Sequence, residues 1–181
     1  MGIRLLHLHL HGLLRSRDLE LGRDADTGGQ TLYVLDLVRN LAKRPEVAQV
    51  DVVTRLVQDS NVAGDYGCPQ EQIVPGARIL RFPFGPDGYL RKELLWPHLE
   101  ELADRLVQHL RRPGQGVDWL HAHYADAGYV GAIVSRRLGI PLIFTGHSLG
   151  REKRRRLLAA GLDLQQVEQS YAMSSRIKAG E

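Results

Sequence analysis

The chain has 181 residues, of which 43% are hydrophobic, a length and composition typical of one globular domain. Its formal net charge is only +3, because 21 acidic residues offset 24 lysines and arginines, so the overall charge favours neither a nucleic-acid nor a membrane partner. Cys68 is the one cysteine, which excludes an internal disulfide, and no apolar run approaches the ~20 residues of a membrane-spanning helix, so we expect a cytoplasmic protein.

The first half of the chain alternates strand and helix patterns. Residues 3–11 and 49–56 carry the apolar and β-branched residues of strands, and residues 28–43 repeat apolar side chains at helical spacing. A segment rich in Gly and Pro follows at 59–76. Residues 78–84 predict a further strand, and Pro83 predicts that the end of this strand lies at an edge.

The second half continues the alternation. It predicts a long helix at 93–112 with six leucines on one face, a strand at 117–122, a helix near 125–138, a strand at 140–145, a basic helical stretch and a last helix near 163–178. Alternating strands and helices imply a parallel sheet with helices on both faces. The fold class is therefore predicted to be α/β with a Rossmann-like sheet.

Three loops are expected to meet at the site of such a fold. In parallel α/β sheets the ligand lies outside the carboxyl ends of the strands. The loops at 11–30, 122–128 and 145–153 each follow a predicted strand, so they converge there. The motifs within these loops are the candidates for function.

The motif DTGGQ opens the first helix. Gly28 and Gly29 allow a ligand to approach the backbone closely, and the free N–H groups of a helix start favour an anion. Gln30 could donate from its side chain, and Asp26 or Thr27 could cap the helix. A plain capped turn is an equally good interpretation of these residues alone, because the spacing matches neither a P-loop nor a dinucleotide fingerprint.

The motif GHSLG follows the last predicted strand and permits two interpretations. Its letters match the G-x-S-x-G elbow of hydrolases, with Ser148 at the centre. A hydrolase triad of that type needs a later histidine, and none follows Ser148 in the chain. His147, at the carboxyl end of a strand, is the better candidate because imidazole can bind sugar hydroxyls or transfer protons.

Histidines alternate along two predicted strands. His7, His9 and His11 share one face of the first strand, and His121 and His123 share a face of the strand at 117–122. The pair His121 and His123 suggests a metal, but no third ligand is obvious for it. Buried or rim-lying histidines are the preferred interpretation, so we expect no metal site.

Basic residues follow GHSLG in a run: Arg151, Lys153, Arg154, Arg155 and Arg156. Such a run could bind nucleic acid, but few aromatic residues accompany it, and most charge runs are solvated faces. Its place beside the expected site suggests a phosphate pocket instead. Lys92, in LRKELLWP, is a further cation at the start of a predicted helix.

Four motifs occur in one order: DTGGQ, RKELLWPHL, HAHYADAG and GHSLGREK. Together they resemble the N-terminal half of retaining GT-B glycosyltransferases, and among these the sucrose-phosphate synthases, over nearly the whole chain. The resemblance implies one acceptor-side Rossmann-like domain over residues 1–181, which is one half of a GT-B fold. It implies transfer of glucose from UDP-glucose to fructose 6-phosphate.

The resemblance also implies roles for individual residues. His147 matches an active-site histidine that contacts the transferred glucose, and Asp126 matches an aspartate near the acceptor. Gly28, Gly29 and Gln30 would lie over the sugar, while Lys92, Lys153 and Arg176 match positions that bind the phosphate of fructose 6-phosphate. No cofactor is implied: UDP-glucose is a substrate, and Mg²⁺ could stimulate the reaction without a protein site.

The resemblance implies that a GT-B enzyme binds its UDP-sugar mainly through a C-terminal domain with an Arg/Lys pair and an E-x₇-E element, whereas the four motifs found here all belong to the N-terminal half. We therefore expect the chain to be inactive alone. Three alternatives remain open: a related transferase such as a mannosylfructose-phosphate synthase, a non-catalytic sugar-phosphate-binding module, and a basic nucleic-acid binder. The last of these predicts salt-dependent binding to duplex DNA, which we do not expect.

Overall fold

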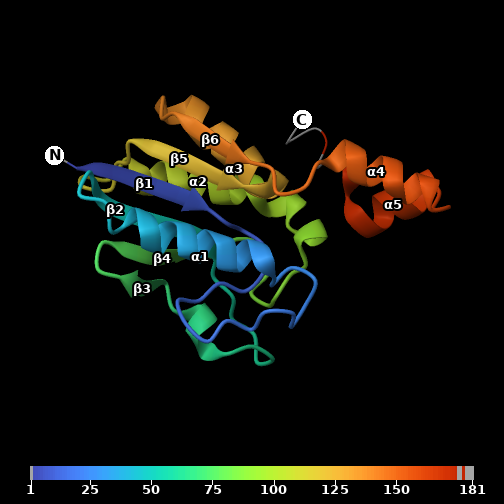
Figure 1. Ribbon diagram of the computed structural model, residues 1–181, viewed down its shortest axis with the longest axis horizontal. Helices are drawn as coiled ribbons and strands as arrows, with labels where there is room; N and C mark the ends of the chain where they lie inside the picture. The colour runs from blue at the N-terminus through green and yellow to red at the C-terminus, as the bar shows by residue number, and fades with distance from the viewer. Residues whose placement is uncertain (1, 175–176, 178–181) are drawn as a thin grey trace.

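Six strands form one sheet in the order β3-β4-β2-β1-β5-β6 in the computed structural model, which describes residues 2–174 and residue 177 (Figure 1). The strands are β1 (Ile3–Leu8), β2 (Val47–Arg55), β3 (Gln70–Val74), β4 (Ala77–Phe82), β5 (Trp119–His123) and β6 (Leu142–Thr145). Every neighbouring pair is parallel except β3 with β4, which is antiparallel. The predicted α/β class with a mainly parallel sheet is confirmed.

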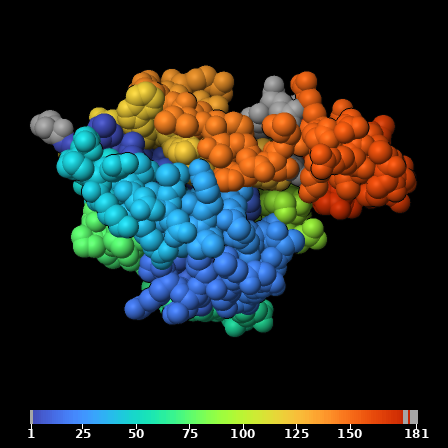
Figure 2. Space-filling view, viewed as in Figure 1, coloured from blue at the N-terminus to red at the C-terminus, as the bar shows by residue number. Residues whose placement is uncertain are grey.

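Helices cover both faces of this sheet. Helix α1 (Gly29–Leu41) packs on one face, and α2 (Leu99–Leu110) and α3 (Tyr124–Leu138) pack on the other. Helices α4 (Gly150–Ala159) and α5 (Leu164–Tyr171) project from one end of the molecule as a separate lobe (Figure 2). Within the described part of the chain, no helix combines the length and apolar character needed to cross a bilayer.

The central strand β1 shows how the sequence divides between the two layers. Leu6 and Leu8 are buried in the cluster formed with α2 and α3. Leu5 packs in the cluster under α1, and His7 shares that side because strand side chains alternate between faces. The alternation of His and Leu from residue 6 onward therefore directs the leucines to the face covered by α2 and α3, and the histidines to the face covered by α1.

The predicted helix at 93–112 is wrong in its first third. Two 3-10 turns, Lys92–Leu94 and Trp96–His98, precede α2, and Leu94 is 56% exposed rather than on the buried face. Pro97 lies in the second turn and lacks the N–H that a continuous α-helix would need there. The turns bring Lys92 back toward the carboxyl edge of the sheet.

The strand predicted at 78–84 is β4, whose ladder with β3 covers Ala77–Leu80 and does not reach its end. β4 lies between β2 and β3, and the Gly/Pro-rich segment before it contains both β3 and the 3-10 turn Gly64–Gly67. Pro83 follows the last residue of β4, so it removes no hydrogen bond from the ladder. The last predicted helix is interrupted rather than continuous: α5 ends at Tyr171, Ala172 adopts a left-handed conformation with φ of 47°, and residues 173, 174 and 177 are helical again.

Candidate functional site

The carboxyl ends of β1, β5 and β6 bring the three predicted loops together. Gln30 donates its side-chain amide to Nδ1 of His9 at 3.0 Å, which joins the start of α1 to the loop after β1. Nδ1 of His123 lies 3.1 Å from Nε2 of His147, which joins β5 to the loop after β6. Nδ1 of His11 lies 2.7 Å from Asp126, which joins the loop after β1 to the loop after β5, so the expected convergence of the three loops is confirmed.

The start of α1 is open rather than capped by a side chain. Gly28 occupies the N-cap position, and no side chain of the described residues accepts a hydrogen bond from the first turn there. The expected caps are used elsewhere: Thr27 accepts from the N–H of Leu13 at 2.9 Å, and Asp26 binds Lys92. The capping prediction is therefore wrong, and the first turn of α1 begins without a side-chain cap among the residues that the structure describes.

A row of hydrogen-bonded imidazoles leads from the sheet to the site. Nδ1 of His7 lies 3.0 Å from Nε2 of His123, whose other nitrogen contacts His147. Burial, and then the neighbouring His121, lowers the pKa of His7 to about 3. Burial and the surrounding histidines lower the pKa of His123 to about 2, so both rings are neutral near pH 7.

His147 ends this row and is the exposed member of it. Partial burial, and then His11, lowers its pKa below 6.5, so it offers a neutral ring to a ligand. Its backbone φ of 53° is unusual for a residue with a side chain, and such strain concentrates at functional sites. In a hydrolase elbow the strained residue is the serine, so the hydrolase interpretation fits this turn poorly.

Two buried hydrogen-bonded pairs, His9 with Thr31 and His11 with Asp126, lie beneath the site. His9 accepts from Gln30 at Nδ1, so its Nε2–H donates to the hydroxyl of Thr31 at 3.2 Å. Nδ1 of His11 lies 2.7 Å from a carboxylate oxygen of Asp126. Burial alone would lower the pKa of His11, but the charge and hydrogen bond of Asp126 outweigh it and raise that pKa. Asp126 therefore favours the charged form of His11 beneath the site.

Lys92 reaches the site but is engaged within the protein. Its ammonium forms an ion pair with Asp26, and its backbone N–H donates to the same carboxylate at 2.8 Å. The ammonium also lies 3.4 Å from Glu93. A phosphate that binds Lys92 must therefore compete with two carboxylates.

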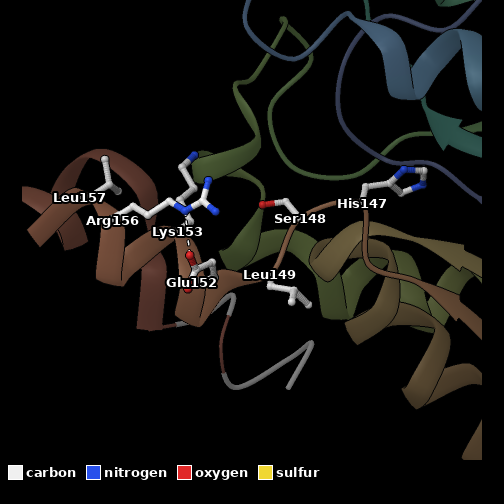
Figure 3. Close-up of a pocket in the computed structure, with 7 residues that line it drawn as sticks. All are labelled: His147, Ser148, Leu149, Glu152, Lys153, Arg156 and Leu157. Atoms are coloured by element: carbon white, nitrogen blue, oxygen red, sulfur yellow. Dashed lines mark hydrogen bonds and ion pairs between the residues drawn. The ribbon is translucent and has the colours of Figure 1, made fainter. Parts of the chain in front are cut away.

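A pocket of about 400 Å³ lies between the loop after β6 and α4 (Figure 3). Its lining includes His147, Ser148, Glu152, Lys153 and Arg156. The ammonium of Lys153 lies 4.5 Å from the centre of the Tyr171 ring, a cation–π contact that ties α4 to α5. Of the basic run, Lys153 and Arg156 are the two cations that line the pocket.

Helix α5 also approaches the segment that carries Lys92. A second pocket, of about 360 Å³, is lined by Arg91, Glu93 and Leu94 together with Gln169, Ser170 and Tyr171. Tyr171 therefore lies between the surroundings of Lys92 and those of Lys153. Arg176, the third predicted phosphate ligand, lies outside the described residues.

Tyr33 is a site residue that the sequence did not suggest. Its ring stands edge-on to His147 with centroids 5.2 Å apart, and the side chain is 47% exposed. It lies one turn along α1 from Gln30, so the helical spacing of three residues was the available signal. The motif DTGGQ drew attention only to the first turn of α1, and Tyr33 lies in the second.

The chain is similar to glycosyltransferases in sequence and fold. The family description "Glycosyl transferase 4-like domain" matches residues 28–176. Two similar relatives are the probable sucrose-phosphate synthase 2 of Arabidopsis thaliana and the sucrose-phosphate synthase of Spinacia oleracea, each 42% identical over 96% of this chain. The chain spans only 19% of the length of each relative. A solved sucrose-phosphate synthase from Thermosynechococcus elongatus shares the fold with a TM-score of 0.71 over 94% of this chain and 40% of that one, at 24% identity.

Proposed function

The chain belongs to the glycosyl transferase 4-like domain family, and from this we propose that it is the acceptor-binding domain of a retaining sucrose-phosphate synthase. The reaction transfers glucose from UDP-glucose to fructose 6-phosphate, gives sucrose 6-phosphate and UDP, and retains the configuration at the anomeric carbon. Relatives that are 42% identical over 96% of this chain carry the name sucrose-phosphate synthase, which supports the choice of reaction.

One arrangement carries the proposal: the open start of α1 faces the same edge of the sheet as His147. Gln30 and His147 both hydrogen-bond to histidines that follow β1 or end β5. Free N–H groups at a helix start stabilise negative charge, and a neutral imidazole can donate to or accept from a sugar hydroxyl. We assign Gly28, Gly29 and Gln30 to the sugars, and His147 to the glucose being transferred.

The phosphate of fructose 6-phosphate is assigned to Lys153, Lys92 and Arg176. Lys153 lines the pocket beside His147, and the ring of Tyr171 limits where its ammonium can lie. Asp26 orients Lys92 and partly neutralises it before the acceptor arrives. Asp126 lies near the acceptor hydroxyls and acts through His11, which it holds at 2.7 Å.

UDP-glucose is assigned mainly to a C-terminal domain that the 181 residues do not include, so the chain alone is proposed to be inactive. Transfer with retention depends on stabilising the negative charge of the departing UDP, which fixed N–H dipoles and cations can supply without a strong protein base. A donor other than UDP-glucose, as in a mannosylfructose-phosphate synthase, is compatible with the same acceptor site. A non-catalytic module would keep the phosphate site and lack transfer.

Titration calorimetry with fructose 6-phosphate tests the acceptor site. A charge-assisted hydrogen bond contributes about 1.5–3 kcal/mol, so Lys153→Ala should weaken binding roughly ten- to a hundred-fold. Arg154→Ala is the matched control, because it removes the same charge from the same helix but does not line the pocket. Equal losses in the two variants would show that only the general charge of α4 attracts the ligand.

A second assay separates the enzyme from a binding module. The donor domain of a sucrose-phosphate synthase is supplied in trans, and UDP release from UDP-glucose and fructose 6-phosphate is measured. Release that disappears with His147→Ala supports the transferase. Tight acceptor binding without any release would favour the module.

A further inference from the structure

We propose that His7, His121 and His123 form a binding site for a divalent transition metal, with Zn²⁺ as the expected ion. The site lies between β1 and β5, and His123 joins it to His147 through a 3.1 Å contact between their rings. It is independent of the proposed sugar-phosphate function, because it depends only on where three imidazoles lie.

Strand pairing assembles the three ligands. His7 of β1 is paired in register with His121 of β5, and His121 and His123 are two residues apart on one strand, so all three share a face of the sheet. One ring nitrogen from each lies within 4.8 Å of those of the other two. The sequence offered His121 and His123 without a third ligand, and the β1–β5 register supplies it.

The spacing is close to that of a metal site. Zinc–nitrogen bonds of about 2.0–2.1 Å place two tetrahedral ligands about 3.3 Å apart. Nδ1 of His7 and Nε2 of His123 are already 3.0 Å apart, so a metal can replace the hydrogen bond between them with small ring movements. His121 must move farther, and it is only half-buried, beside the exposed side chains of Trp119 and Ile143.

Each of two ligands has an outer partner that orients it. Nε2 of His121 lies 2.7 Å from the hydroxyl of Thr145, which leaves Nδ1 for the metal. Nε2 of His123 faces His7, while its Nδ1 contacts His147 at 3.1 Å. Metal-binding histidines commonly donate their second ring nitrogen to such a partner.

The proton balance is simple. In the metal-free form one proton lies between Nδ1 of His7 and Nε2 of His123. Both nitrogens must be free of protons to bind a metal, so this proton moves to the second nitrogen of the same ring. No net proton is released, and a water completes the four-coordinate site. The metal would hold His123, and through it His147, in one orientation.

Cobalt titration of the complete 181-residue chain, without a tag and first treated with a chelator, tests the site. We expect one Co²⁺ per chain with the visible absorption of tetrahedral coordination, displaced by Zn²⁺, and a rise in melting temperature with Zn²⁺. His121→Ala should weaken binding by at least about a hundred-fold, and His147→Ala roughly ten- to a hundred-fold through the lost outer partner.

His109→Ala is the matched control, because His109 lies on α2 and packs against Phe82, away from the cluster. It should bind Co²⁺ like the unaltered chain. His7→Gln supplies a second ligand deletion, and circular dichroism checks that each variant is folded. Failure of the unaltered chain to bind one equivalent, or equal affinity in a folded His121→Ala, would overturn the proposal.

Discussion

Replacement of Gly12 by alanine should destabilise the loop that supports the start of α1. Gly12 has a φ of +76°, and a Cβ built there would lie 2.4 Å from the carbonyl oxygen of Asp26 and 2.9 Å from its carbonyl carbon. Both atoms belong to the backbone, so no side-chain rotation can relieve the contact. The loop must move away from Asp26, the residue that binds Lys92.

Two effects add at this position. A left-handed conformation costs a residue with a Cβ roughly 1–2 kcal/mol, and forcing atoms into a packed position costs typically 1–3 kcal/mol. Gly12→Ala should therefore lower the free energy of unfolding by about 2–5 kcal/mol. Gly114 has nearly the same φ, +77°, but its Cβ would meet nothing within 4 Å, so Gly114→Ala should show only the conformational part.

Urea unfolding followed by circular dichroism measures both variants against the unaltered chain. The account predicts that Gly12→Ala loses at least about 1 kcal/mol more than Gly114→Ala, which is the lower limit of the packing effect. Unfolding of the two variants at the same urea concentration would show that the close approach of Gly12 to Asp26 contributes nothing to the loss of stability.

Two further predictions concern protonation, both measured in chelator-treated protein. The pKa of His7 and that of His123 are far below 6.5 in the folded chain, so the unfolded chain binds more protons below pH 6.5. The free energy of unfolding therefore falls as the pH decreases from 6.5, by up to about 1.4 kcal/mol per pH unit for each ring. Urea unfolding at pH 6.5, 5.5 and 4.5 should show a shallower decrease in His7→Gln, and an unchanged slope would contradict the assigned burial. The pKa of His11 is raised, so its stabilising contribution is complete below about pH 6.5 and is lost as the pH rises through the folded value. Asp126→Asn removes the cause, so NMR titration should show a lower pKa for His11, and no change would mean that Asp126 does not charge this ring.

The alternation of apolar strands and amphipathic helices was enough to predict the α/β class and the edge at which the loops meet. β3 was missed because QEQIV is short, polar in its first three residues and placed in a Gly/Pro-rich segment. The early start predicted for α2 ignored Pro97, whose missing N–H favours the 3-10 turns before it. Local pattern therefore predicts elements well and their ends less well.

The sequence predicted which loops meet at the candidate site, but not the contacts between their residues. Gln30, His147 and Asp126 could be chosen from motifs at strand and helix ends. The partner of each depends on register and loop packing: His7 meets His121 and His123 only because β1 pairs with β5 at that register. The sequence likewise suggested Asp26 as a helix cap. In the structure its backbone packs against Gly12 and its carboxylate forms an ion pair with Lys92.

Amide NMR shifts on addition of fructose 6-phosphate test whether α1 and α4 share one acceptor site. The account predicts concentration-dependent shifts at Gly29 and Gln30 of α1 and at Lys153 of α4, with inorganic phosphate shifting Lys153 alone. Shifts confined to α4, or found with fructose 6-phosphate only at residues far from the carboxyl edge of the sheet, would contradict an acceptor site shared by these two helices.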